Sequence, residues 1–229
     1  MRYKHIVEGV YIKRPNRFIA HVQIDGREEV CHVKNTGRCK ELLVPGVKVW
    51  LEKSDNPERK TAYDVIAVEK GDRVINMDSQ LPNAVAYEWI ANQKERLGIA
   101  ELKREVTFGN SRFDLWGKLN NGQEFFVEVK GVTLESDGIV RFPDAPTERG
   151  IKHLEELIKC KTDGYGAALL FVIQMSDVKW FEPNVETHAQ FGETLKKAHN
   201  AGVIIKAFDC MVKPDEMYMQ KEVEVRLGL

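Results

Sequence analysis

The sequence predicts two domains: a small five-stranded β-barrel, followed by an α/β domain in which helices flank a mixed sheet. As far as residue 70, short segments of alternating apolar and polar residues are separated by turn residues, as is typical of an all-β domain. From residue 81 onward, segments with helical apolar periodicity alternate with strand-like runs, which is typical of α/β domains. The segment INMDSQLPN lies between these regions, so we expect domains at 1–78 and 79–229.

Five strands and one short helical segment are predicted for the first domain. The strands are expected at residues 4–13, 17–24, 28–34, 47–53 and 62–69. Asp25-Gly26 forms a tight turn between the second and third strands. The loop Asn35-Thr36-Gly37-Arg38 and the helical segment CKELL separate the third strand from the fourth. This succession is the layout of an OB barrel, a shape that often binds oligonucleotides across its face.

The second domain is predicted to begin with a helix from Leu81 to Leu97, with Pro82 in its first turn and Asp78 or Ser79 as its cap. The elements expected next are strands over SRFDLWGKL and QEFFVEVKGVTL, a strand from Ile139 to Phe142, a helix carrying Ile151, Leu154, Leu157 and Ile158, and the strand AALLFVIQM at 167–175. The order helix, three strands, helix, strand is that of the PD-(D/E)xK restriction-endonuclease-like fold. Packing and sheet extension are then expected from the helix HAQFGETLKKAHNAG and the strands VIIKAFDCMV and EVEVRL.

A hairpin joins the first two of these strands through Asn120-Asn121-Gly122. Directly opposed residues of an antiparallel pair point to the same face, so apolar positions should oppose apolar positions. A two-residue Asn-Gly turn would oppose Asp114 to Val129 and mix the faces. A three-residue loop instead opposes Asp114 to Glu128 and keeps Phe113 with Val129. We therefore predict the three-residue loop, with Gly122 at the position that needs a positive φ.

Asp114, Glu128 and Lys130 share one face in this register, and two interpretations remain open. Opposed carboxylates repel each other and an unpaired buried charge is costly, so a cation is expected beside them. Lys130 alone would complete an ordinary ion cluster. Alternatively, Asp114 and Glu128 are ligands of a hard metal ion, with the carbonyl of Val129 as a third ligand, and Lys130 orients or activates the attacking water. Such a site suits phosphodiester hydrolysis with Mg²⁺ or Mn²⁺.

The helix after the hairpin adds four polar side chains, Glu148, Arg149, Lys152 and His153. Helical spacing puts Glu148 beside Lys152 and Arg149 beside His153. A surface face of ion pairs is one interpretation, and a helper of the metal site, in the case of Glu148, is the other. The catalytic candidates are thus Lys130, Glu128, Asp114 and Glu148, with Asn83 and Glu88 as candidates for lining the cleft.

Basic residues cluster near the expected strand ends of the first domain. Those we expect to bind nucleic acid are Arg38, Lys34, Arg14, Arg17 and Lys40, with Tyr11 and Phe18 available for base stacking. Arg38 is the foremost of them, because Gly37 permits a tight backbone and a guanidinium can take a phosphate bidentately. The alternative is a solvated basic rim with the aromatic rings in the core, in which Arg38 bonds to loop carbonyls.

Composition is that of a globular protein without a membrane span. The 229 residues are 43% hydrophobic and 30% charged, and four cysteines are scattered without a CxxC pair, which favours reduced thiols in a cytoplasmic protein. We find neither a long apolar run nor the apolar centre of a signal peptide. The net charge is −1 overall, with +3 on residues 1–78 and −4 on the remainder, so any nucleic-acid surface must be local.

Several longer stretches resemble the sugar fermentation stimulation protein family. They are NTGR at 35–38, DSQLPN at 78–83, SRFDL at 111–115, VEVKGVTL at 127–134 and FPDAPTERGIKHLEEL at 142–157. The resemblance implies an OB-like first domain, a PD-(D/E)xK second domain, DNA binding in a bacterial or archaeal cytosol, and a historical link to sugar utilisation. The nuclease-type motif of that fold then maps onto Asp114, Glu128 and Lys130.

Two functions of different classes follow. The first is a protein that binds DNA, double-stranded DNA above all, and hydrolyses phosphodiesters with Mg²⁺ or Mn²⁺. The second is a non-catalytic DNA-binding or regulatory protein linked to sugar utilisation, in which the acidic cleft is structural. A metal-dependent hydrolase of a small phosphorylated metabolite is a third interpretation, and it would need no basic barrel.

Overall fold

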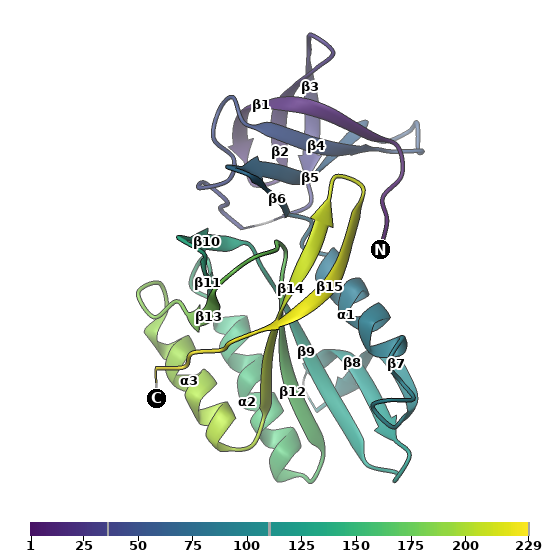
Figure 1. Cartoon of the computed structure of the whole chain (residues 1–229), viewed down its shortest axis with the longest axis vertical. Helices are drawn as coiled ribbons and strands as arrows, with labels where there is room; N and C mark the ends of the chain where they lie inside the picture. Colours follow the sequence, from purple (N-terminus) through teal and green to yellow (C-terminus); the bar gives the residue numbers. More distant parts are fainter. Residues whose placement is uncertain (36, 110, 229) are drawn as a thin grey trace.

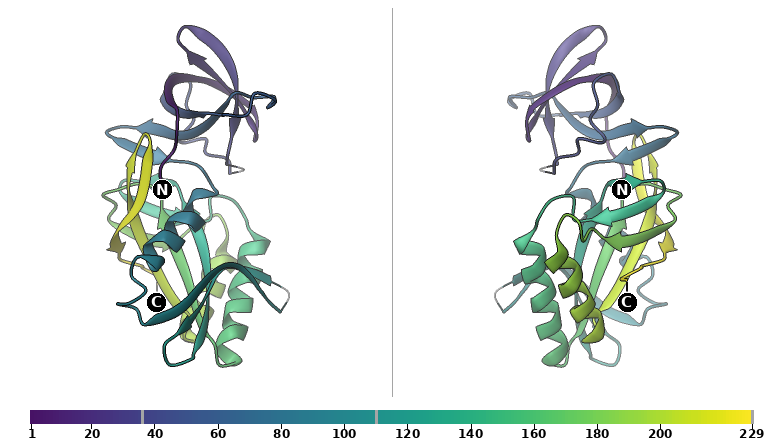
Figure 2. Two further views of the ribbon diagram at one scale, coloured as in Figure 1. Left: turned by 90° about the vertical axis from the view of Figure 1, so that its right-hand side faces the viewer. Right: turned by 90° about the vertical axis from the view of Figure 1, so that its left-hand side faces the viewer.

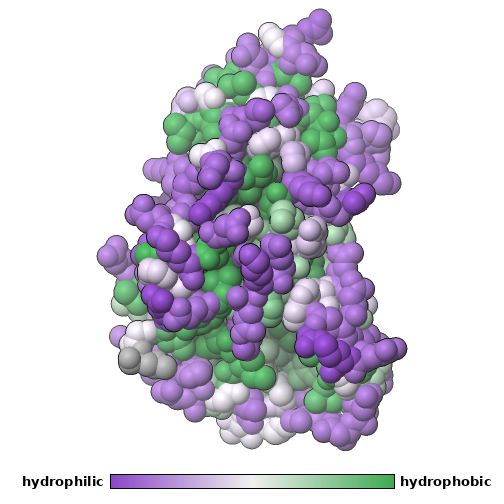
Figure 3. Space-filling view, viewed as in Figure 1, coloured by the Kyte–Doolittle hydropathy of each residue, from purple (hydrophilic) through white to green (hydrophobic). Residues whose placement is uncertain are grey.

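The computed structural model of the chain describes residues 1–35, 37–109 and 111–228, so Thr36 of the NTGR segment lies outside the described residues. A β-barrel forms one end of the elongated molecule and an α/β domain forms the other (Figure 1). On the face seen in Figure 3, hydrophilic side chains cover much of both domains, with apolar side chains between them. None of the helices in the described ranges has the length and apolar character needed to cross a membrane.

The barrel is a single sheet that closes on itself. Its strands are β1 (Ile6–Asn16), β2 (Ile19–Ile24), β3 (Arg27–Val33), β4 (Lys48–Lys53), β5 (Tyr63–Lys70) and β6 (Arg73–Asn76). They run in the order β3-β2-β1-β4-β5-β6, and a parallel pairing of β3 with β5 closes the first five into a barrel. The predicted five-stranded OB barrel is confirmed, and β6 adds a hairpin that leads into the second domain.

The predicted helical segment CKELL is wrong, because the chain makes only a single turn there. The amides of Leu42 and Leu43 both donate to the carbonyl of Cys39, and no further helical turn follows. Cys39 begins the segment in the left-handed region, with φ 45°. Pro45 ends it, because a proline disfavours helical backbone at the residue before it.

The second domain is built on a six-stranded mixed sheet with helices on both faces (Figure 2). Its strands are β7 (Ile99–Phe108), β8 (Ser111–Leu119), β9 (Glu124–Val132), β12 (Gly166–Ile173), β14 (Ile204–Lys213) and β15 (Glu216–Val223), and its helices are α1 (Leu81–Ala91), α2 (Glu148–Thr162) and α3 (Ala189–Asn200). The order is β15-β14-β12-β9-β8-β7, in which β9, β12 and β14 are parallel and the outer strands antiparallel. The predicted mixed sheet with flanking helices is confirmed.

Three details of this domain differ from the expectation. The first helix ends at Ala91 rather than Leu97, and a series of turns follows as far as Gly98. Its N-cap residue is Gln80, whose side chain makes no capping hydrogen bond, instead of Asp78 or Ser79. Strand β7 has no counterpart in the expected elements, because most of its residues are exposed and show no apolar alternation. The strand at Ile139–Phe142 is present as β11, but it lies in a separate small sheet between β10 (Leu134–Ser136) and β13 (Trp180–Pro183).

Apolar side chains cover both faces of the large sheet. Val127 and Val129 pack with α1, whereas Phe126 packs in the other core, which also contains residues of α2 and α3. Phe113 packs against Phe126, at a ring-centroid distance of 5.5 Å, in the core opposite to that of Val129. The expectation that Phe113 shares a face with Val129 is therefore wrong. The alternation of β8 breaks at Asp114, where the pairing with β7 is interrupted and Glu105 of β7 has φ 56°.

Buried polar contacts join the barrel to the second domain beside the carboxyl ends of β9 and β12. Gln174, which is 1% exposed, donates from Nε2 to the backbone and side-chain oxygens of Asn76, at 3.1 and 3.0 Å. Lys70 of β5 places its Nζ 2.6 Å from Glu135 Oε2 in β10. These contacts cross from one domain to the other, so the barrel is held at the edge of the sheet where β9 ends.

Candidate active site

The β8–β9 hairpin has the predicted three-residue loop. Leu119 N donates to Gln123 O at 2.8 Å, and Gly122 has φ 88°. The paired residues run from Lys118 and Glu124 to Leu115 and Val127, and one further step of this register sets Asp114 opposite Glu128. The backbone pairing stops at that step, because the carboxylate of Asp114 takes the place of a backbone partner.

Asp114 is held by two hydrogen bonds. Its Oδ2 accepts from the backbone amide of Val129 at 2.7 Å, and its Oδ1 accepts from Asn83 Nδ2 of α1 at 2.6 Å. Burial, together with the negative charge of Glu128, raises the pKa of Asp114 to about 6, and the two hydrogen bonds and Lys130 only partly oppose this rise. The raised pKa therefore reflects burial first and the neighbouring acid second.

Glu128 is the most buried charged group of the site, with 2% exposure. Lys130 Nζ donates to its Oε1 at 2.5 Å, and Nδ1 of His153 contacts the same oxygen. Burial opposes ionisation of Glu128, but these two partners outweigh burial and hold its pKa below the ordinary value. The second oxygen, Oε2, is buried and has no hydrogen-bond partner.

His153 is the site residue whose role could not be read from the sequence. It belongs to α2, is 7% exposed and points at Glu128 rather than outward. The available sequence signal was the helical spacing of His153 with residues that face the core. The buried residues at that spacing are Gly150, His153, Leu154 and Leu157. The predicted contact between Arg149 and His153 is present, since Arg149 Nε donates to His153 Nε2 at 3.4 Å.

Two of the other acidic candidates point elsewhere. The side chain of Glu148 is 85% exposed and faces His188 Nε2 at 3.7 Å, so it does not join Asp114 and Glu128. Glu148 is the first residue of α2, and its neighbours Pro146 and Arg149 are exposed as well. Glu88 pairs with the N-terminal amine at 2.7 Å on the surface.

The carboxylate pair fits a divalent metal ion. A buried carboxylate oxygen without a partner costs free energy unless a cation or donor reaches it, and Oε2 of Glu128 is such an oxygen. Hard cations such as Mg²⁺ and Mn²⁺ prefer oxygen ligands, and Mg²⁺ is commonly bound through one or two carboxylates while it keeps several waters. Within the described ranges no group of three or more His, Cys, Asp or Glu side chains is arranged to hold a metal, so the fit is that of a two-carboxylate site.

Asp114 should make the stability of the metal-free protein depend on pH. Its folded pKa of about 6 exceeds the ordinary 3.8, so its contribution to stability is fully present below about pH 4 and is lost as the pH rises through 6. A pKa difference of about 2 corresponds to about 3 kcal/mol. We expect Asp114→Asn, which does not titrate, to gain up to that much over wild type between pH 4 and pH 7 in EDTA. Urea unfolding of both proteins across this range measures the difference, and parallel pH profiles would contradict it.

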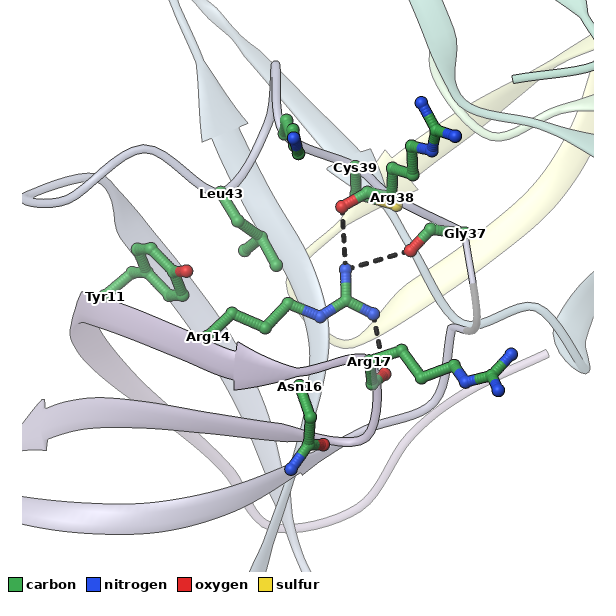
Figure 4. Close-up of a pocket in the computed structure, with 9 residues that line it drawn as sticks. Tyr11, Arg14, Asn16, Arg17, Gly37, Arg38, Cys39 and Leu43 are labelled. Carbon is green, nitrogen blue, oxygen red and sulfur yellow. Dashed lines mark hydrogen bonds between the residues drawn. The ribbon is translucent and has the colours of Figure 1, made fainter. Parts of the chain in front are cut away.

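Two of the basic residues predicted to bind nucleic acid, Arg14 and Lys34, have their polar partners within the protein. The guanidinium of Arg14 donates to the carbonyls of Gly37, Arg38 and Arg17 (Figure 4). It also donates to the carbonyl of Asn35, so it holds the loop together. Lys34 lies within 3.5 Å of carboxylate oxygens of Glu52, Asp64 and Asp78. Neither cation is therefore presented to a ligand, and the loop carbonyls are bonded by Arg14 instead of by Arg38.

The remaining three cations surround a pocket of about 400 Å³ on the barrel. Arg17, Arg38 and Lys40 are exposed on its rim, and Arg14, Tyr11 and Leu43 form part of its lining. In Figure 4 the side chains of Arg17 and Arg38 extend away from the bonded guanidinium of Arg14. Tyr11 is 4% exposed and belongs to the core, whereas Phe18 is 48% exposed with Arg17 over its ring.

The loop that carries Arg38 touches the second domain. Arg38 N donates to Asp144 Oδ2 at 3.3 Å, and Asp144 lies in the segment that leads into α2. A Cβ on Gly37 would lie 2.5 Å from the same oxygen, so a larger residue there would displace the side chain of Asp144. The basic pocket is thus tied to the domain that holds the carboxylates.

Domain-family models match the two halves of the chain. The SfsA N-terminal OB domain matches residues 12–77, and the sugar fermentation stimulation protein RE domain matches residues 80–216. The sugar fermentation stimulation protein homolog of Clostridium beijerinckii is 56% identical over 227 residues, which are 99% of this chain and 100% of the relative. The homolog of Ruminiclostridium cellulolyticum is 54% identical over the same shares of both chains.

A solved structure of the same family also matches this chain over both domains. The structure of Pyrococcus furiosus SfsA in complex with Ca²⁺ matches with a TM-score of 0.89 and 30% sequence identity, and the match covers 99% of this chain and 98% of that one. The relationship therefore extends over both domains and over the hairpin that carries the carboxylates. The chain belongs to the sugar fermentation stimulation protein family.

Proposed function

We propose that this protein binds DNA and hydrolyses its phosphodiester bonds with Mg²⁺ or Mn²⁺ held by Asp114 and Glu128. The observation that carries the proposal is the buried, unpartnered Oε2 of Glu128 in a site that also contains Asp114 and Lys130. Carboxylates that can hold a divalent ion, beside an amine that can offset developing charge, suit phosphoryl transfer. The Ca²⁺ in the Pyrococcus furiosus SfsA structure supports a hard-cation site in this family.

Each side chain would have a separate task. Asp114 and Glu128 would hold the metal ion, which when bound would neutralise charge at the phosphoryl oxygens. Asn83 and the Val129 amide fix the carboxylate of Asp114, so that it is preorganised rather than free to rotate. Lys130, whose side chain is 16% exposed, is reachable by substrate and orients the attacking water while it offsets developing negative charge.

The DNA backbone would cross the rim of the barrel pocket. Arg17, Arg38 and Lys40 are exposed there, and the loop of Arg38 touches Asp144 just before α2. Phosphate contacts by such cations supply sequence-independent affinity, which suits a protein of net charge −1 with a local basic surface. Double-stranded DNA is the preferred substrate in this proposal.

Replacing Arg38 by Ala should weaken DNA binding by about tenfold, since a hydrogen bond to a charged group contributes about 1.5 kcal/mol. The loss should be similar for unrelated sequences, and the slope of log affinity against log salt should fall by about one. Fluorescence anisotropy at several salt concentrations measures both. Lys197→Ala removes an equal charge from the exposed surface of α3 and should leave affinity unchanged. Equal affinities of the Arg38→Ala and Lys197→Ala proteins would place the DNA surface elsewhere.

A cleavage assay tests the proposed reaction. Pure protein is incubated with linear, circular and single-stranded DNA and with RNA, in Mg²⁺, in Mn²⁺ and in EDTA. We expect cleavage of DNA with either metal and none in EDTA. Absence of cleavage from every substrate, together with equal DNA binding by wild type and Asp114→Asn, would make a non-catalytic regulatory protein the better account. Absence of nucleic-acid binding altogether would favour hydrolysis of a small phosphorylated metabolite.

A further inference from the structure

The two oxygens of Glu128 have opposite surroundings. Oε1 is contacted by Lys130 Nζ and by Nδ1 of His153, whereas the buried Oε2 has no hydrogen-bond partner. A carboxylate that could turn freely would share its two donors between both oxygens. The side chain of Glu128 is therefore held in one orientation, in which Oε2 has no donor.

The partners on both sides of the His153 ring, Glu128 at Nδ1 and Arg149 at Nε2, together indicate which nitrogen carries a proton. A guanidinium has only donors, and Arg149 Nε donates to His153 Nε2 at 3.4 Å, so Nε2 must accept. A proton then lies on Nδ1, which contacts the accepting Oε1 of Glu128 and donates to it. Lys130 Nζ also lies 3.4 Å from Nδ1, but it donates to the nearer Oε1, at 2.5 Å. With the opposite tautomer, two lone pairs would face each other at Glu128, and Nε–H of Arg149 would meet another N–H.

We propose that His153 and Arg149 are positioning residues, which hold Glu128 by its Oε1 so that Oε2 is presented to the divalent cation. This inference rests on the proposed metal-dependent function. His153 is 7% exposed, so no solvent molecule readily replaces it, and the ring is fixed on α2 next to buried Leu154. Lys130 donates to the same Oε1, which leaves the metal-facing oxygen clear of both side chains.

Metal affinity in the absence of DNA tests the proposal without reference to catalysis. Loss of a group that orients a metal ligand costs about 10- to 100-fold in metal affinity, and we expect that loss of Mn²⁺ affinity in His153→Leu. In His153→Asn the amide can donate from nearly the position of Nδ1, so affinity should recover to within a few-fold of wild type. Calorimetric titration with Mn²⁺ measures all three proteins, and thermal unfolding verifies that each is folded.

Arg149→Lys is the matched test of the tautomer. It keeps the positive charge but lacks the Nε–H that donates to His153. Long-range ¹H–¹⁵N NMR spectra of the histidine rings report which nitrogen is protonated in the metal-free protein. We expect the Nδ1–H form of His153 in wild type, and its partial loss together with several-fold weaker Mn²⁺ binding in Arg149→Lys.

The outcomes separate this inference from the proposed function. Wild-type protein that binds no Mn²⁺ would overturn the proposed function and the metal-presenting role with it. Wild type that binds Mn²⁺ but shows an Nε2–H ring at His153 would overturn the inference alone. Folded His153→Leu that bound Mn²⁺ as tightly as wild type would likewise overturn the positioning role and leave the metal site in place.

Discussion

Asp114→Asn protein should lose metal-dependent cleavage of DNA almost completely while it keeps its fold. The amide has nearly the same shape as the carboxylate, so its oxygen can still accept from the Val129 amide. It lacks the negative charge that a hard cation prefers, and the proposed metal site would be reduced to one carboxylate. We expect at least a 10²- to 10³-fold fall in the rate, comparable to loss of a preorganised charge-stabilising group in other enzymes.

Single-turnover cleavage at saturating DNA, with Mg²⁺ titrated, measures this effect. Asp72→Asn is the matched control, because Asp72 is an exposed acid in the β5–β6 turn of the barrel. The control should cleave at the wild-type rate. If Asp114→Asn cleaved as fast as the control at every Mg²⁺ concentration, Asp114 would not be a metal ligand and the assignment of the site would fail.

Lys130→Ala should depress the cleavage rate far more than it depresses metal binding. Its amine is expected to act on the attacking water and on developing charge, where loss of one stabilising group costs about 10²- to 10³-fold in rate. It also donates to Glu128 Oε1, but we expect the buried ring of His153, which we propose orients that carboxylate, to stay in place in the variant. Metal affinity should therefore change only several-fold.

Comparison of two titrations separates these roles. Mn²⁺ binding by calorimetry gives the affinity, and single-turnover rates at saturating Mn²⁺ give the chemical step. A Lys130→Ala protein whose rate returned to the wild-type value at high Mn²⁺ would show that Lys130 serves metal binding alone. Lys130→Arg keeps the charge with a different donor geometry, and we expect it to recover only a small part of the rate.

The hairpin was predictable because apolar residues alternate strictly between the two faces of its strands next to the loop. Trp116 and Phe126 oppose each other, as do Leu115 and Val127, so only one loop length keeps the faces apart. Phe113 was not predictable from the same rule. The alternation of β8 breaks at Asp114, where a carboxylate bonds to the backbone of β9 in place of the sheet pairing.

His153 and Arg14 show a different limit. Both are polar residues in a sequence context that suggests a surface, and their roles depend on partners that are distant in the chain or on backbone carbonyls. His153 meets Glu128 across 25 residues, and Arg14 meets the carbonyls of a loop about 20 residues away. Sequence periodicity reports which face of an element is apolar, but not which polar group a buried side chain will find.

The barrel and the second domain could be predicted separately, but their mutual placement could not. Gln174 follows β12 as one polar residue after an apolar run, and its contacts with Asn76 exist only once both domains are folded. The same is true of Arg38 and Asp144, which lie 106 residues apart. Contacts of this kind hold the loop of the basic pocket against the segment that leads into α2.

Anomalous diffraction from crystals soaked in Mn²⁺ tests the central claim most directly. We expect a peak beside Asp114 and Glu128, with Oε2 of Glu128 among its ligands and Mn–O distances of about 2.0–2.6 Å, as for hard cations on carboxylates. Crystals of Asp114→Asn should lose most of this peak. A Mn²⁺ ion bound only elsewhere, or an Oε2 that stays without a cation at saturating Mn²⁺, would contradict the proposed metal site.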